Sequence, residues 1–133
     1  MNVKYNFGIV FVILLLLAVF NISQSAEAGS LDGKTYKGEM GEKGKTNGNE
    51  ETIEFKDGRF HSASCDEYGF TAAPYTSETK GDLTKFSSVT ISQKEGKMNW
   101  TGIVKGDMLE ATATWNKEGQ PDQQFWVKGQ LEK

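Results

Sequence analysis

The chain has little cysteine, histidine or proline. Its 133 residues include one cysteine, Cys65, one histidine, His61, and two prolines. A single cysteine cannot form an internal disulfide, so the fold must depend on a hydrophobic core. Zinc sites usually take several ligands from Cys and His, so we predict no metal site. The lone thiol is left with three fates, which are burial, reactivity, or pairing with a second chain.

Long hydrophobic runs are also missing, except at the amino terminus. Residues 7–20 are apolar apart from Gly8, they follow the basic Lys4, and they precede a polar stretch that ends in small residues. This order is typical of a secretory signal peptide. A membrane-spanning helix needs about 20 apolar residues, so an uncleaved anchor is the less favoured alternative.

The small residues Ser25, Ala26 and Ala28 indicate the cleavage site. We predict cleavage after Ala28, with Ser25 and Ala26 as alternatives. Residues 1–28 are then a signal peptide, and residues 29–133 form a single domain that is secreted or periplasmic. The chain would contact a membrane only during export.

An excess of positive charge is absent as well. The chain has 15 Lys and Arg against 18 Asp and Glu, which gives a formal net charge of −3. Nucleic-acid binding calls for a concentrated basic face, so we predict no nucleic-acid partner. No glycine-rich phosphate loop or serine elbow occurs either, and we expect no cofactor.

The sequence does contain many short segments rich in Thr, Val, Ile and aromatic residues, separated by glycine-bearing turns. This spacing is typical of an all-β protein. The predicted strands lie near residues 34–40, 51–56, 59–64, 68–78, 84–92, 97–105, 108–116 and 123–131. Asp57-Gly58 predicts a type I′ hairpin, Gly106-Asp107 is predicted to turn in the same way, and residues 41–50 are expected to form a mobile polar loop.

Consecutive hairpins predict a small up-and-down antiparallel meander. About eight strands would leave exposed edges unless the sheet closes, so we favour a barrel over a sandwich. Period-two alternation is clearest near the carboxyl terminus, where alternate residues predict one buried face per strand. The predicted inward residues are Met98, Trp100, Gly102, Val104, Leu109, Ala111, Ala113, Trp115, Phe125, Val127, Gly129 and Leu131.

Three aromatic residues precede a glycine by two or three positions. These pairs are Tyr36 with Gly38, Trp100 with Gly102, and Trp126 with Gly129. Glycine within a strand often marks a bend whose bare backbone an aromatic ring covers, so we interpret the pairs as structural.

The segment from Trp100 to Gly129 resembles the closing strands of avidin-type barrels, in which tryptophans and glycines recur at these places. Avidins, like lipocalins, are eight-stranded exported barrels with an open mouth. The resemblance implies an aromatic-walled ligand site. It does not imply biotin, because residues 85–89 lack the expected tryptophan and residues 36–39 lack the expected asparagine and serine. The lipocalin Gly-x-Trp pattern is also absent, since Thr35 follows Gly33-Lys34.

An eight-stranded barrel is either filled by its own side chains or holds one small ligand. Small inward residues, Ala111 and Ala113 beside Trp115, favour a cavity. The candidate ligand-binding residues are Tyr36, Ser64, Cys65, Tyr68, Trp100 and Trp115. A core that fills the whole barrel is the alternative interpretation.

Catalysis is not predicted. On an extended strand, residues four apart are separated by about 13 Å, so His61 cannot activate Cys65 unless the chain folds back.

The leading hypothesis is an exported barrel that binds a small apolar or aromatic ligand. The alternative is a structural or protein-interaction domain with no small ligand, for which Cys65 offers one route of linkage to a partner, and an enzyme ranks third. Asn99-Trp100-Thr101 is a glycosylation acceptor if the source is eukaryotic. The oligomeric state stays open.

Overall fold

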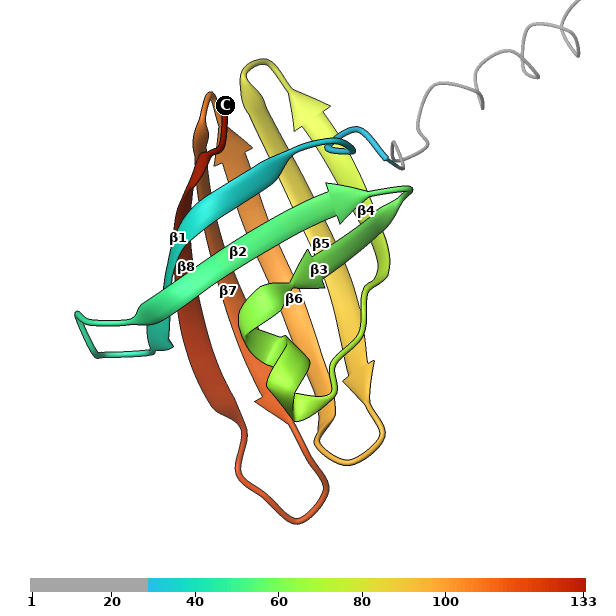
Figure 1. Cartoon of the computed structure of the whole chain (residues 1–133), viewed down its shortest axis with the longest axis vertical. Helices are drawn as coiled ribbons and strands as arrows, with labels where there is room; N and C mark the ends of the chain where they lie inside the picture. The colour runs from blue at the N-terminus through green and yellow to red at the C-terminus, as the bar shows by residue number, and fades with distance from the viewer. Residues whose placement is uncertain (1–28) are drawn as a thin grey trace, which may run out of the picture.

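The fold is a closed barrel of antiparallel strands in chain order, seen in a computed structural model that describes residues 29–133. The predicted signal peptide lies outside the described residues. Each strand pairs with the next, and β8 returns to pair with β1 (Figure 1). The strands are β1 Thr35–Glu42, β2 Asn49–Lys56, β3 Arg59–Ser62, β4 Ala73–Lys80, β5 Leu83–Ser92, β6 Gly96–Lys105, β7 Met108–Asn116 and β8 Gln123–Leu131.

The predicted all-β meander barrel is therefore confirmed, and two of its turns show why it forms. Asp57 and Gly58 have φ angles of 53° and 73°, which is the double positive φ of a type I′ hairpin. In the β6–β7 turn only Gly106 has a positive φ, at 57°. The prediction that Gly106-Asp107 turns in the same way is wrong, because a single leading glycine suits a type II′ turn.

The predicted strands 59–64 and 68–78 are wrong where they approach each other. β3 stops at Ser62, the 3-10 helix η3 spans Ala63–Tyr68, and β4 starts only at Ala73. Gly69 ends the helix with a φ of 85°, and its N–H donates to the Asp66 carbonyl. No helix in residues 29–133 is long and apolar enough to cross a membrane.

The predicted loop at 41–50 is shorter than expected, because strand pairing extends into it. β1 continues to Glu42 and β2 begins at Asn49, so only residues 43–48 connect the two strands. The Trp126 indole N–H donates to the Lys45 carbonyl at 2.9 Å and so ties this loop to the outside of β8.

A short turn at the start of the described chain closes the end of the barrel that is uppermost in Figure 1. Leu31 inserts into the core with 1% of its surface exposed. The Asp32 carboxylate accepts a hydrogen bond from the Tyr75 hydroxyl at 2.7 Å and another from the Gly58 N–H at 2.9 Å. The Leu31 N–H in turn donates to the Tyr75 hydroxyl at 3.0 Å. This turn therefore belongs to the folded domain and seals one end.

Aromatic rings fill the middle of the barrel. Phe55 makes edge-to-face contacts with Tyr36, Phe60, Tyr75 and Phe86 at centroid distances of 4.9–6.1 Å. Such packing combines a large buried apolar area with favourable ring geometry. Trp100 continues the cluster against Phe60 at 4.8 Å. The upper and central parts of the barrel are therefore a packed core.

Small inward residues make room for these rings. A Cβ on Gly102 would lie 2.5 Å from the Phe86 ring, and Ala113 lies opposite Trp100 on the neighbouring strand. Of the three predicted aromatic–glycine pairs, only Gly102 is covered by a ring, and that ring is Phe86 of the adjacent strand; Gly38 instead lies against the backbone of β8. On the outer wall Trp126 covers Gly41 in the same way, at 2.5 Å from a Cβ built there.

Candidate functional site

The lower end of the barrel, opposite the closed end, holds a partly open cavity of about 620 Å³. It lies between η3 and the ends of β1, β6, β7 and β8. Its apolar wall consists of Met40, Met98, Trp115, Phe125 and Phe70. A cavity of this size and lining is typical of small-molecule sites.

Four of the six predicted ligand-binding residues line this cavity. They are Ser64, Cys65, Tyr68 and Trp115. Tyr68 stands at the rim with 53% of its surface exposed. The Trp115 indole N–H donates to the Glu95 carbonyl at 2.7 Å, which fixes the ring as part of the wall.

The other two predicted residues belong to the core. Trp100 is 1% exposed, and its indole N–H donates to the Thr90 hydroxyl at 3.1 Å. Tyr36 packs against Phe55, and its buried hydroxyl has no hydrogen-bond partner among the described residues. Neither side chain lines the lower cavity.

The small residues that suggested a hollow barrel do not border this cavity. Ala111 and Ala113 lie opposite Gly102 and Trp100, in the packed centre. The sequence prediction missed Met40, Phe70 and Gln123 as lining residues. Met98 and Phe125 carried a usable signal, because both were placed on the inward face of their strands.

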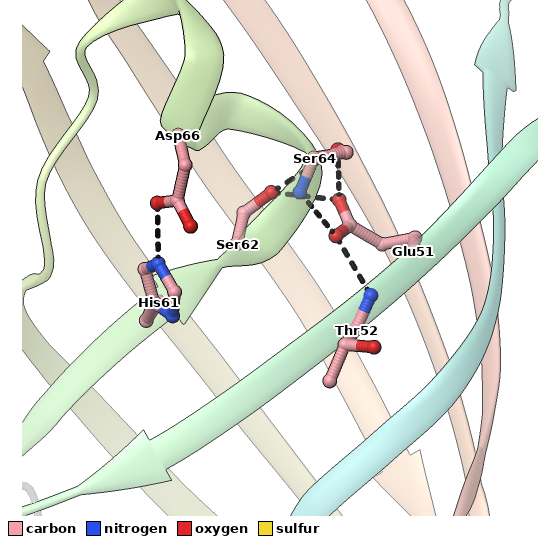
Figure 2. Close-up of polar contacts among 6 residues, drawn as sticks. All are labelled: Glu51, Thr52, His61, Ser62, Ser64 and Asp66. Carbon is pink, nitrogen blue, oxygen red and sulfur yellow. Dashed lines mark hydrogen bonds and ion pairs between the residues drawn. The ribbon is translucent and has the colours of Figure 1, made fainter.

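A buried carboxylate lies behind the cavity wall. Glu51 on β2 points inward with 3% of its surface exposed and meets the start of η3 (Figure 2). Its Oε2 accepts from the hydroxyls of Ser62, at 2.7 Å, and Ser64, at 2.6 Å. Its Oε1 accepts from the backbone N–H of Ser64, at 3.0 Å, and of Thr52, at 2.8 Å.

The hydrogen bonds to Glu51 satisfy its oxygens but bring no positive charge. Four donors around two acceptor oxygens match the needs of an ionised carboxylate. No Lys, Arg or His side chain in the described part of the chain forms an ion pair with it. A buried charge without a counter-charge is unusual, because buried ions are normally paired. Glu51 therefore sets a negative potential beside the cavity.

The Cys65 thiol is buried next to this carboxylate. It is 4% exposed, burial raises its pKa, and the charge of Glu51 raises it further. Both effects favour the thiol over the nucleophilic thiolate. The chain does fold back at η3, but His61 uses its Nε2 to contact Asp66 Oδ1 at 2.6 Å (Figure 2). This pair connects β3 to η3 and does not engage the sulfur.

Four carboxylates stand among the residues around the cavity, which include no lysine or arginine. They are Glu42, Glu50, Glu67 and Glu95. Glu42 pairs with Lys45 at 2.8 Å and Glu95 with Lys117 at 3.5 Å. The Lys45 hydrogen bond lowers the pKa of Glu42. Glu50 and Glu67 form no ion pair within the described range, so the rim keeps a negative charge.

Metal binding has little support from this geometry. In residues 29–133 no three His, Cys, Asp or Glu side chains come close enough together to hold a metal ion. The arrangement instead offers an apolar chamber with a buried negative charge behind one wall and an acidic rim.

Alkaline pH is expected to destabilise the barrel. Burial raises the pKa of Cys65 above its ordinary 9.0, and burial likewise raises the pKa of Tyr36 and Tyr75 above 10.0. The unfolded chain then ionises first, so these groups add no pH dependence below about pH 8, and the free energy of unfolding falls as pH rises further. Urea denaturation from pH 7 to 11 measures this. Above pH 10 the free energy of unfolding of Tyr75→Phe should decline less steeply than that of the unaltered protein. Equal slopes would show that Tyr75 does not contribute to the decline.

Comparisons with protein families, with curated proteins and with solved structures gave no match for this chain.

Proposed function

We propose that the protein is an exported barrel that binds a small, largely apolar or aromatic ligand in its lower cavity. The observation that carries the proposal is the contrast between the two ends. One end is sealed by Leu31 and the middle is packed with rings, whereas the other end keeps a chamber of about 620 Å³. Enclosed apolar chambers with a few polar groups are the usual form of small-ligand sites.

Export is the second part of the proposal, and it is supported by the amino-terminal sequence. The basic start, the apolar run and the small residues before Gly29 are typical of a signal peptide. Ser30, two residues after the predicted cleavage site at Ala28, already contacts the barrel through a hydrogen bond between its hydroxyl and that of Ser77. The resemblance to avidin-type and lipocalin barrels supports binding at the level of architecture alone.

The alternative of a domain linked through Cys65 receives less support. A disulfide to a second chain needs an accessible sulfur, and Cys65 is 4% exposed behind η3. Opening η3 would break the contacts of Ser64 with Glu51 and of Asp66 with His61. Formation of a covalent dimer would therefore require η3 to detach from the barrel.

A neutral fluorescent probe tests the binding proposal. The full chain is expressed in an exporting host, and the purified protein is titrated with N-phenyl-1-naphthylamine. We expect probe fluorescence to rise and the tryptophan emission of the protein, to which Trp115 contributes, to fall. Gln123→Trp, which fills the cavity from its lining, should weaken binding about tenfold or more.

The matched control is Gln130→Trp, which changes the same residue type on the outward face of the same strand. It should leave probe affinity unchanged. Absence of probe binding, or equal weakening by both variants, would sink the proposal. Intact mass of the exported protein shows whether the chain begins at Gly29.

A further inference from the structure

The lower cavity has a buried carboxylate beside it whose charge is not neutralised by a cation of the described residues. Glu51 is buried, fully hydrogen-bonded and without a cation partner in the described residues. An ion placed in the interior costs several kcal/mol in lost hydration unless an opposite charge approaches it. In a purely structural role, an amide side chain could accept the same backbone hydrogen bonds without burying a charge.

Charges around the opening have the same sign. Four glutamates lie at the cavity, and only two of them are neutralised by neighbouring lysines. Glu50 and Glu67 are left without an ion pair in the part of the chain that the structure describes. A concave site whose charges share one sign focuses its field and concentrates ligands of the opposite sign.

From these observations we infer that the ligand is a cationic amphiphile, in which an apolar or aromatic body carries one ammonium group. The inference rests on the proposed function, since it specifies the ligand of the same cavity. The apolar body packs against Met40, Met98 and Phe125, and the ammonium group faces the wall formed by Ser64, behind which Glu51 lies. The rings of Trp115 and Tyr68 add faces that attract a cation.

An organic cation fits better than a metal ion. Metal ions of the calcium type need several oxygen ligands around one point. In residues 29–133 the carboxylates do not gather in that way. An ammonium group needs only a negative potential and one or two acceptors, while its apolar body fills the chamber.

Glu51→Gln is a sharp test because an amide can keep the same hydrogen bonds. The amide oxygen can accept from the N–H groups of Ser64 and Thr52, as Oε1 does now. The amide nitrogen can donate to the Ser62 and Ser64 hydroxyls, which are able to accept as well as donate. The variant removes the charge and preserves the connections.

The experiment measures displacement of N-phenyl-1-naphthylamine at neutral pH by decylamine, 1-decanol and decanoate, which share one alkyl chain. We expect decylamine to displace the probe at a concentration about tenfold lower than decanol, with decanoate weakest. Glu51→Gln should remove most of this preference while leaving probe and decanol affinities unchanged. Its unfolding midpoint, measured in parallel, confirms that the barrel is intact.

The rim contribution is separated with a double variant. Combining Glu50→Gln with Glu67→Gln should weaken decylamine binding severalfold. This effect should shrink at high salt because exposed charges are screened. Glu78→Gln with Glu110→Gln removes the same charge from the outer wall and should change nothing.

The outcomes distinguish the two proposals. If the probe binds but decanol and decylamine compete equally, or Glu51→Gln leaves the preference intact, the charge inference is overturned while ligand binding stands. If neither the probe nor any of the three alkyl compounds binds, the proposed function itself fails.

Discussion

Gly38→Ala should lower the free energy of unfolding by about 3 kcal/mol, because strong overpacking of a fitted interior costs this much. Gly38 lies in β1, opposite Gly129 of β8, at the seam that closes the barrel. A Cβ at Gly38 would overlap the carbonyl oxygen of Lys128, which is backbone and cannot rotate away. The methyl group would therefore force the two strands apart. Urea denaturation followed by tryptophan fluorescence measures the loss.

The control is the opposite member of the same glycine pair. A Cβ on Gly129 would lie 3.3 Å from the Cβ of Tyr36, which is tight but can be relieved by a small shift. Gly129→Ala should therefore cost clearly less than Gly38→Ala. Equal costs would show that the tight approach of β8 to Gly38 does not determine stability. Faster amide hydrogen exchange in β1 and β8, with little change in β5 and β6, would locate the effect at the seam.

Glu51→Ala has the second large expected effect. Removing the carboxylate leaves the Ser62 and Ser64 hydroxyls and the N–H groups of Ser64 and Thr52 without their acceptor. Buried donors that lose their partner cost about 1–3 kcal/mol each, and water entering from the cavity offsets part of the loss. We expect a net loss of about 3 kcal/mol in the free energy of unfolding.

Glu51→Gln serves as the matched variant, since it keeps the four hydrogen bonds and should cost less than about 1 kcal/mol. A large difference between the alanine and glutamine variants means that Glu51 organises η3 through hydrogen bonds and not through its charge. If both variants are equally destabilised, the charge of Glu51 itself stabilises the fold. The inference that this charge serves to bind a cationic ligand would then lose its basis.

The hairpin framework was predictable because local sequence determines it. Asp57-Gly58 permits the two positive φ angles of its turn, and the alternating residues of 97–105 and 108–116 define their inward faces without reference to other strands. Closure followed from the number of strands and the cost of free edges. The fold class therefore depended on short-range signals.

The segment 63–72 was not predictable in the same way. Residues 59–64 were predicted to form one strand, but Ser64 belongs to η3, where it donates to Glu51 of β2, which is distant in sequence. The local signal for a helix end was Gly69, whose positive φ terminates η3. This segment forms one wall of the cavity, and the prediction included its residues Ser64, Cys65 and Tyr68 but missed Phe70.

The burial of Glu51 could not have been inferred from sequence alone. Charged residues are almost never fully buried, and Glu50-Glu51 at a strand start resembles a solvated loop. Its inward position depends on the β1–β2 register, and its hydrogen-bond donors come from η3. The aromatic candidates Trp100 and Trp115 illustrate the same limit. Both side chains point into the barrel. Only their positions along its axis place Trp100 in the core and Trp115 in the cavity wall.

Closure between β1 and β8 also determines when the barrel can form. Every other strand pair joins neighbours in sequence, whereas this seam joins the first strand to a strand that ends at Leu131, near the C-terminal Lys133. β8 is the last of the eight strands in chain order, so β1 and β7 keep open edges until β8 docks between them. Such edges pair readily with other chains. The folding step most exposed to aggregation is therefore the last one, and a chain truncated before Gln123 would remain an open sheet.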